Sequence, residues 1–326
     1  MRAVLCKRYG PPSSLIIEDV PSLVACPSQV VIDVHACGVN FPDSLVIQGT
    51  YQFQPALPFS PGGEVAGVVK GVGPGVTAFR VGDRVFATMT YGGYAEEALA
   101  EVRRMVLMPD GMDFNTAATF MVAYGTSHHA LKDRADLQPG ETLLVLGAAG
   151  GVGLAAVEVG KAMGARVIAA ASSGEKLAVC RQHGADALIN YVSDDLRSQI
   201  KMLTDGRGVD VVYDPVGGQY SEPALRSTAW GGRFLVVGFS TGQIPALPFN
   251  LPLLKGCSIV GVFWGLFANN DPERNAKNSK ELLTWLGQGK LHPHISASYP
   301  LERASEALTH ITNRTATGKV VLTTRD

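Results

Sequence analysis

The stretch TLLVLGAAGGVGL, residues 142–154, decides the fold of this chain. An apolar run of Leu and Val leads directly into a glycine-rich turn, and an Ala- and Val-rich segment of helical length follows. A strand that is apolar along its whole length is typical of a parallel sheet covered by helices on both faces. Within the turn, Ala148-x-Gly150-x-x-Gly153 fits the dinucleotide-binding fingerprint, with Ala at its first position.

The glycines of such a motif have separate roles. One allows the tight turn, one lets the backbone approach a pyrophosphate, and one lets helix and strand pack closely. The N–H groups at the start of the following helix then face the phosphates, whose charge the helix dipole favours. An ordinary glycine-rich turn is the alternative. The position between a good strand and a good helix favours a dinucleotide site at Gly150, Gly151 and Val152.

The composition is that of a globular protein with room for about two domains. The 326 residues are 46% hydrophobic and 17% charged, with a net charge of −1. This balance gives no basic footprint for a nucleic acid, and the sequence shows neither a signal-peptide core nor a membrane-spanning stretch. The five cysteines are scattered without a Cys-x-x-Cys pair, so we expect reduced thiols in a cytoplasmic protein.

The pattern of elements changes near Asp113. Before it the sequence predicts short strands separated by turn residues, at residues 30–36, 64–73, 81–87 and 93–98. After it we expect a helix over residues 114–131, capped by Asn115 or Thr116, and then alternating strands and helices. A compact β-rich domain followed by a doubly wound parallel sheet accounts for both patterns.

Several motifs occur in order along nearly the whole chain. They are GVNFPD (38–43), PGGEVAGVV (61–69), GDRVF (82–86), GGYAE (92–96), residues 147–154, GGR (231–233) and ATGKVVL (316–322). By these motifs the chain resembles the medium-chain dehydrogenase/reductase superfamily, and within it the zinc-independent, zeta-crystallin-like quinone oxidoreductase branch. The resemblance implies an α/β fold with a GroES-like β-rich catalytic domain over residues 1–122 and 264–326, and a Rossmann NADPH-binding domain over residues 123–263.

The metal ligands of zinc-dependent relatives are missing. Those relatives have Cys where Asn40 stands and His where Gly63 stands, beside Glu64, and the four-cysteine structural lobe is absent too. Tetrahedral zinc needs three or four Cys, His or carboxylate ligands, and Cys37 with Glu64 falls short. We therefore expect no metal. Without a Lewis acid, hydride transfer requires an electron-poor acceptor such as a quinone or an α,β-unsaturated carbonyl.

The end of the second strand of the parallel sheet favours NADPH over NADH. Residues 172–174 are Ser-Ser-Gly, with no carboxylate to hold a ribose 2′-OH or to repel a 2′-phosphate. The resemblance assigns the 2′-phosphate to Ser172, Lys176 and Tyr191. A solvated Lys176 is the alternative, and Glu175 is the residue that fits a phosphate site least. Further nicotinamide-nucleotide contacts implied by the family are Thr126, Gly238, Ser240, Phe263 and Arg314.

Asn40 and Tyr51 are the catalytic candidates. A neutral amide at Asn40 can donate to a substrate or nicotinamide oxygen, although a turn residue is the alternative. In relatives an aromatic residue at the place of Tyr51 lines the substrate pocket, and its hydroxyl can give a hydrogen bond or proton to the reduced oxygen. A core or interface tyrosine is the alternative. His128 and His129 suit a surface or packed position better than acid–base chemistry.

The sequence thus predicts an NADPH-dependent, zinc-independent oxidoreductase that transfers hydride to a small electron-poor acceptor, a quinone. One alternative is a reductase of the C=C bond of an enone or enoyl thioester. Another is an NADPH-binding protein with little turnover. The apolar strand over residues 258–263 is expected at a sheet edge, where the family commonly dimerises, so we predict a homodimer without a nucleic-acid or membrane partner.

Overall fold

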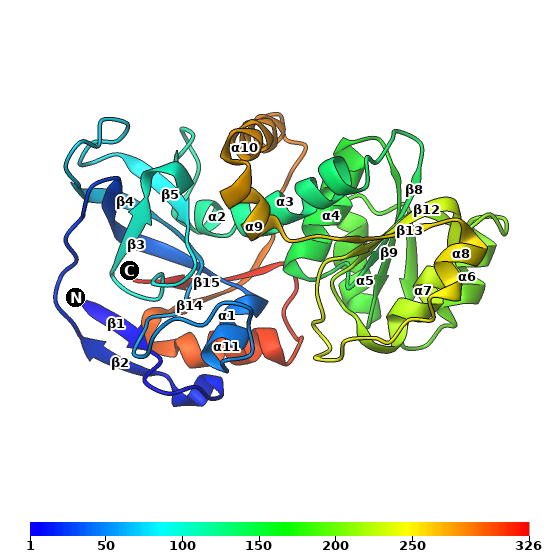
Figure 1. Ribbon diagram of the computed structural model, residues 1–326, viewed down its shortest axis with the longest axis horizontal. Helices are drawn as coiled ribbons and strands as arrows, with labels where there is room; N and C mark the ends of the chain where they lie inside the picture. Colours follow the sequence, from blue (N-terminus) through cyan, green and yellow to red (C-terminus); the bar gives the residue numbers. More distant parts are fainter. Residues whose placement is uncertain (326) are drawn as a thin grey trace. The chain divides into compact units, whose positions relative to one another are not determined.

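The computed structural model describes residues 1–325 and divides into two compact units (Figure 1). The first unit is Met1–Val122 together with the segment from Pro293 onward, and the second is Ala123–His292. Within residues 1–325, no helix has both the length and the apolar character needed to cross a membrane.

The first unit is built on a mostly antiparallel sheet in the order β14-β15-β3-β4-β5-β7, with β6 also paired to β3. β1 and β2 form a separate antiparallel pair. The C-terminal strand β15, drawn red in Figure 1, pairs with β3, drawn blue, so both ends of the chain build this unit. Its elements are β1 (Arg2–Leu5), η1 (Pro12–Ser14), β2 (Ile16–Asp19), β3 (Gln29–Val39), α1 (Phe41–Ile47), β4 (Glu64–Val72), β5 (Arg84–Thr88), β6 (Glu97–Glu101), η2 (Val102–Arg104), β7 (Met105–Leu107), α2 (Phe114–Ala118), β14 (Ile295–Pro300), η5 (Leu301–Arg303), α11 (Ala304–Thr312) and β15 (Lys319–Thr323).

The second unit is a parallel sheet in the order β10-β9-β8-β11-β12-β13. This is the strand order of a doubly wound dinucleotide fold, so the predicted fold class is confirmed. The central strand β8 is buried at every position, as its apolar sequence predicts. The elements are α3 (Met121–His128), which begins just before the unit boundary, the π-helix η3 (His129–Arg134), β8 (Thr142–Leu146), α4 (Gly151–Ala162), β9 (Arg166–Ala171), α5 (Gly174–Gln182), β10 (Ala187–Asn190), α6 (Leu196–Leu203), β11 (Val209–Asp214), η4 (Gly218–Tyr220), α7 (Ser221–Arg226), β12 (Thr228–Val236), α8 (Asn250–Lys255), β13 (Ser258–Gly261), α9 (Trp264–Asn270) and α10 (Pro272–Gly287).

The helix predicted over residues 114–131 is wrong in two respects. It is divided into α2, α3 and η3, because the Thr119 hydroxyl donates to the carbonyls of Asn115 and Thr116 and ends α2 there. Its N-cap is Asp113, whose carboxylate accepts the Thr116 N–H at 2.9 Å. The strand expected at residues 93–98 also begins later, as β6 at Glu97.

The return of the chain to the first unit also differs from the sequence expectation. Residues 264–292, expected in the catalytic domain, lie in the second unit. The reason is side-chain packing: the indole of Trp264 lies against Gly125, where an added Cβ would be 2.8 Å from the ring. Glu281 on α10 also pairs with His128 of α3. These contacts tie α9 and α10 to the helix that opens the second unit.

Candidate functional site

The glycine-rich turn after β8 forms a cradle that only glycine permits. Gly147 has φ +57°, and a Cβ on Gly153 would lie 2.3 Å from the Gly147 carbonyl oxygen. Gly150 is the N-cap of α4, and the Leu154 N–H makes the first backbone bond of that helix, to the Gly150 oxygen. The N–H groups of the first helical turn therefore have no intrahelical partner. A pyrophosphate fits this place by charge and shape.

The end of β9 brings together the three residues predicted for the 2′-phosphate. Lys176 Nζ donates to Ser172 Oγ at 3.2 Å, and the Tyr191 N–H donates to the Ala171 carbonyl at 3.2 Å. Tyr191 also packs on Tyr220, with ring centroids 4.3 Å apart. Glu175 is exposed at the first turn of α5. The Lys176 ammonium and the Ser172 hydroxyl thus meet at the end of β9, with the Tyr191 backbone next to it, and these two groups could bind an anion.

The remaining nucleotide candidates lie at different places. Gly238 and Ser240 follow β12, and their N–H groups donate to the Asp214 and Pro215 carbonyls at 3.2 and 3.1 Å, beside the end of β11. Phe263 follows β13 and is half exposed. All three therefore follow the carboxyl ends of parallel strands, where ligands bind in this fold. Thr126 is half-buried on α3, and Arg314, at φ +56°, belongs to the first unit.

Ser127 lies next to the glycine cradle, and the sequence reasoning missed it. Its hydroxyl donates to the Val152 carbonyl at 2.8 Å and lies 3.1 Å from the Tyr213 hydroxyl. This contact fixes α3 against the first turn of α4, beside the glycine cradle. A serine in a helix carries no sequence signal for such a role.

A buried polar cluster in the first unit surrounds Asn40. Lys319 Nζ donates to Glu64 Oε1 at 2.6 Å and to Asn40 Oδ1 at 2.5 Å. Asn40 Nδ2 donates to the same Glu64 oxygen at 2.9 Å, and the Val122 N–H donates to Glu64 Oε2 at 3.1 Å. The Lys319 and Glu64 side chains are only 6% and 2% exposed. Sequence reasoning noted Glu64 but missed Lys319, which lies far away in the chain.

Asp43 adds a second carboxyl group to this region. Its Oδ2 accepts the Asn40 N–H at 2.8 Å and the Tyr94 hydroxyl at 3.0 Å. Burial raises the pKa of Asp43 to about 7, although these two hydrogen bonds and Lys319 oppose the shift. Burial, and next the charge of Asp43, also raise the pKa of Tyr51, which packs on the core of this unit. Tyr51 therefore keeps its proton at neutral pH and can act as a donor.

These residues do not fit a zinc ion. Asn40 Oδ1 and Glu64 Oε1 both accept hydrogen bonds from the Lys319 ammonium, which is itself a cation and can only donate. At Gly63 an added Cβ would lie 3.3 Å from the Met89 carbonyl oxygen. In the part of the chain that the structure describes, no three His, Cys, Asp or Glu residues form a group that could hold a metal.

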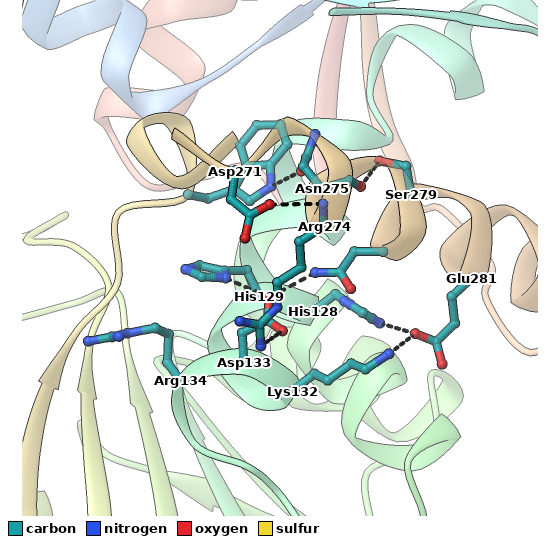
Figure 2. A network of polar contacts seen from close by, with 12 residues as sticks. His128, His129, Lys132, Asp133, Arg134, Asp271, Arg274, Asn275, Ser279 and Glu281 are labelled. Atoms are coloured by element: carbon teal, nitrogen blue, oxygen red, sulfur yellow. Dashed lines mark hydrogen bonds and ion pairs between the residues drawn. The ribbon is translucent and has the colours of Figure 1, made fainter. Parts of the chain in front are cut away.

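His128 and His129 belong to a network that fastens α9 and α10 to α3 and η3 (Figure 2). His128 Nε2 donates to Glu281 at 2.9 Å, and Lys132 donates to the same carboxylate. The other histidine stacks on Phe267 at 3.9 Å, and its Nδ1 lies 2.8 Å from Asp133. Burial lowers the pKa of both histidines. Their role is packing within the second unit, as the sequence analysis favoured.

Comparison with known proteins agrees with this two-part architecture. The family described as alcohol dehydrogenase GroES-like domain matches residues 26–110, and the one described as zinc-binding dehydrogenase matches residues 151–281. A quinone oxidoreductase-like protein 2 homolog from Nematostella vectensis is 42% identical over 99% of this chain and 89% of its own length. The human quinone oxidoreductase is 36% identical, over 99% of this chain and 97% of that protein.

A solved structure extends the likeness to the fold. The Escherichia coli quinone oxidoreductase complexed with NADPH has a TM-score of 0.93 and 27% identity, covering 99% of this chain and 100% of that one. The chain belongs to the medium-chain dehydrogenase/reductase superfamily, in its quinone oxidoreductase branch. It is therefore an oxidoreductase by family, with a GroES-like and a Rossmann domain.

Proposed function

We propose that this protein is a zinc-independent reductase that uses NADPH to reduce a quinone. The observation that carries the proposal is the Lys319–Glu64–Asn40 cluster, which puts a buried ammonium among the side chains where zinc-dependent relatives carry metal ligands. The names of the relatives, and the NADPH bound to the Escherichia coli protein, support the same reading. When bound, NADPH supplies the hydride for the reduction.

The second unit supplies most of the nucleotide contacts of this proposal, and the first unit contributes Arg314. The N–H groups of Gly151 and Val152, after Gly150, would hold the pyrophosphate, because the helix dipole favours negative charge there. Ser172, Lys176 and Tyr191 would hold the 2′-phosphate through one charge-assisted contact and two hydroxyls. Further contacts are assigned to Thr126, Gly238, Ser240, Phe263 and Arg314.

The first unit supplies the acceptor side. One Asn40 Nδ2–H is given to Glu64, while the amide nitrogen approaches the Gly38 oxygen only at 3.5 Å, so the second N–H is available to an acceptor oxygen. Tyr51 keeps its hydroxyl proton because of its raised pKa and can give it to the reduced oxygen. Hydrogen-bond donors placed where negative charge develops lower the barrier to its formation.

The direct test follows NADPH absorbance with an ortho-quinone, with a short-chain enone and with NADH in place of NADPH. We expect rapid oxidation of NADPH with the quinone and slow oxidation of NADH. Turnover with the enone alone would replace the quinone assignment by a C=C reductase. Tight NADPH binding without turnover of either compound would refute the enzymatic proposal.

The cofactor preference has its own test in Lys176→Met. Loss of the charged contact should weaken NADPH binding about tenfold, since a charge-assisted hydrogen bond contributes about 1.5 kcal/mol or more. NADH binding should not change, because NADH lacks the 2′-phosphate. Lys201→Met, an exposed lysine on α6, is the matched control. Equal weakening of both nucleotides would refute the 2′-phosphate assignment.

We further propose that two copies pair through β13, the last strand of the parallel sheet. The exposed fractions nearby are 81% for Trp230, 92% for Phe249 and 76% for Leu253, an unusual concentration of large apolar side chains. Leu253→Glu should convert a dimer into a monomer in light scattering. Val24→Glu, at an exposed apolar position of the first unit, should not.

The free cysteines, four of them buried, suit a reducing compartment, and we place the protein in the cytoplasm.

A further inference from the structure

Strand register brings Lys319 to Asn40. β15 pairs with β3 antiparallel, with Val320 opposite Val39, so Lys319 at the start of β15 lies across from Asn40, which follows β3. β3 also pairs with β4, with Cys37 opposite Val65, which brings Glu64 beside the end of β3. The pairing of β15 with β3 and of β3 with β4 therefore places the Lys319 ammonium and the Glu64 carboxylate next to the Asn40 amide.

The chemistry of these two groups allows only one orientation of the Asn40 amide. A lysine ammonium can only donate, so it faces Oδ1, at 2.5 Å. An ionised carboxylate can only accept, so it faces Nδ2, at 2.9 Å. Rotating the amide by 180° would set an N–H₂ group against the ammonium and an oxygen against the carboxylate. Both contacts would then be repulsive.

The surrounding backbone holds the carboxylate in place. Glu64 Oε2 accepts the Val122 N–H at 3.1 Å. Gly38 leaves the space that the carboxylate fills, because an added Cβ there would lie 2.4 Å from Glu64 Oε1. The Lys319–Glu64 pair is thus fixed in place, unlike a mobile surface pair. Because both side chains hydrogen-bond to Asn40, they hold its amide in a fixed orientation.

We propose that Lys319, acting with Glu64, is a positioning residue that sets the orientation of the Asn40 amide and so presents its second N–H to the acceptor oxygen. The inference rests on the proposed function for the identity of the acceptor. The orientation of the amide itself does not depend on which acceptor is used. Lys319 therefore acts on acceptor reduction through Asn40, and the nucleotide contacts of the second unit are independent of it.

The test compares wild type with Lys319→Met/Glu64→Gln, which removes both charges together and leaves no unpaired ion. Lys7→Met is the matched control, since Lys7 pairs with Glu18 at the same 2.6 Å but both side chains are exposed, 48% and 41%. We expect kcat with the quinone to fall about 10- to 100-fold in the double variant, with the Kd for NADPH unchanged. The control should keep the wild-type kcat.

Introducing the same two changes into Asn40→Ala shows whether Lys319 acts through the amide. If it does, they lower kcat no further once Asn40 has lost its amide. An equal fall in the wild-type and Asn40→Ala backgrounds would overturn the proposal, and so would an unchanged kcat in the wild-type background.

A readout without turnover separates this proposal from the proposed function. In protein labelled with ¹⁵N-asparagine, the Asn40 side-chain N–H₂ signals should exchange slowly with solvent in wild type and quickly in the double variant. Equal exchange in both would overturn the positioning role even for an active enzyme. Slow exchange lost in the double variant supports it even if no quinone is reduced, in which case the proposed function alone has failed.

Discussion

The glycine cradle and the Asn40 cluster are built from different kinds of contact. Gly147, Gly150 and Gly153 form the cradle within one turn and the start of one helix. The cluster instead joins Asn40 to Lys319, 279 positions away in the chain. The cradle uses backbone groups, which any sequence with the right glycines supplies. The cluster uses buried charged side chains, which are stable there only because they pair with each other. The glycine cradle therefore depends on the absence of side chains that would fill its turn. The Asn40 cluster depends on oppositely charged side chains from distant parts of the chain.

Lys319→Met should have the largest effect, because it leaves the Glu64 carboxylate buried without its cation. Removing one partner of a buried pair costs about 3–5 kcal/mol of unfolding free energy. Urea unfolding measures this loss. Lys319→Met/Glu64→Gln should recover most of it, and Lys7→Met, which breaks the exposed Lys7–Glu18 pair, should leave the urea midpoint nearly unchanged. If single and double variants are equally destabilised, packing rather than charge pairing holds the cluster together.

Gly153→Ala tests the cradle by space alone. The new Cβ would lie 2.3 Å from the Gly147 oxygen and 2.9 Å from the Ala148 Cα, both backbone atoms that cannot easily move. We expect a loss of about 3 kcal/mol in unfolding free energy and at least a tenfold weaker Kd for NADPH by fluorescence titration. Gly287→Ala is the control, because its Cβ would meet nothing within 4 Å. A variant that binds NADPH normally would contradict the cradle.

Asp43→Asn tests how burial of a carboxyl group affects stability. The pKa of Asp43 is about 7 in the folded protein and about 3.9 when unfolded. Between these values the folded state holds a proton that the unfolded state has lost, so stability falls as pH rises and levels off above about 7. Asp43→Asn has no carboxyl group to titrate here, so it does not lose stability in this way. The unfolding free energy of the variant minus that of wild type should therefore increase by about 2 kcal/mol between pH 5 and pH 8. Urea unfolding at the two pH values measures it.

The smallest effects are expected at helix caps, where the two units should behave alike. Asp113 caps α2 in the first unit through Thr116 N–H, and Asp271 caps α10 in the second through Arg274 N–H. Each change to Ala should cost about 1 kcal/mol, and the two should add. Thermal unfolding of the two single variants and the double variant checks this. Strong non-additivity of the two stability losses would show that the Asp113 and Asp271 caps are coupled and do not act only on their own helices.

The sequence determined the features that depend on neighbours in the chain. The apolar run of β8 and the glycines after it predicted the parallel sheet and the place of the nucleotide motif, because burial of a strand and the shape of a turn are set locally. Ser172 and Lys176, four residues apart, are in contact because α5 begins between them. The resemblance to relatives supplied the domain roles.

Tertiary structure alone decided the surroundings of Asn40 and the partner of α10. Nothing near Lys319 in the sequence marks it as buried, since a lysine at the start of a strand is normally solvated. Its partner is defined only when β15 pairs with β3 and β3 with β4. Likewise His128 meets Glu281 only after α10 packs on α3. The physical reason is the same in both cases: a buried charge is stabilised by its partner, and pairing of distant segments brings that partner near.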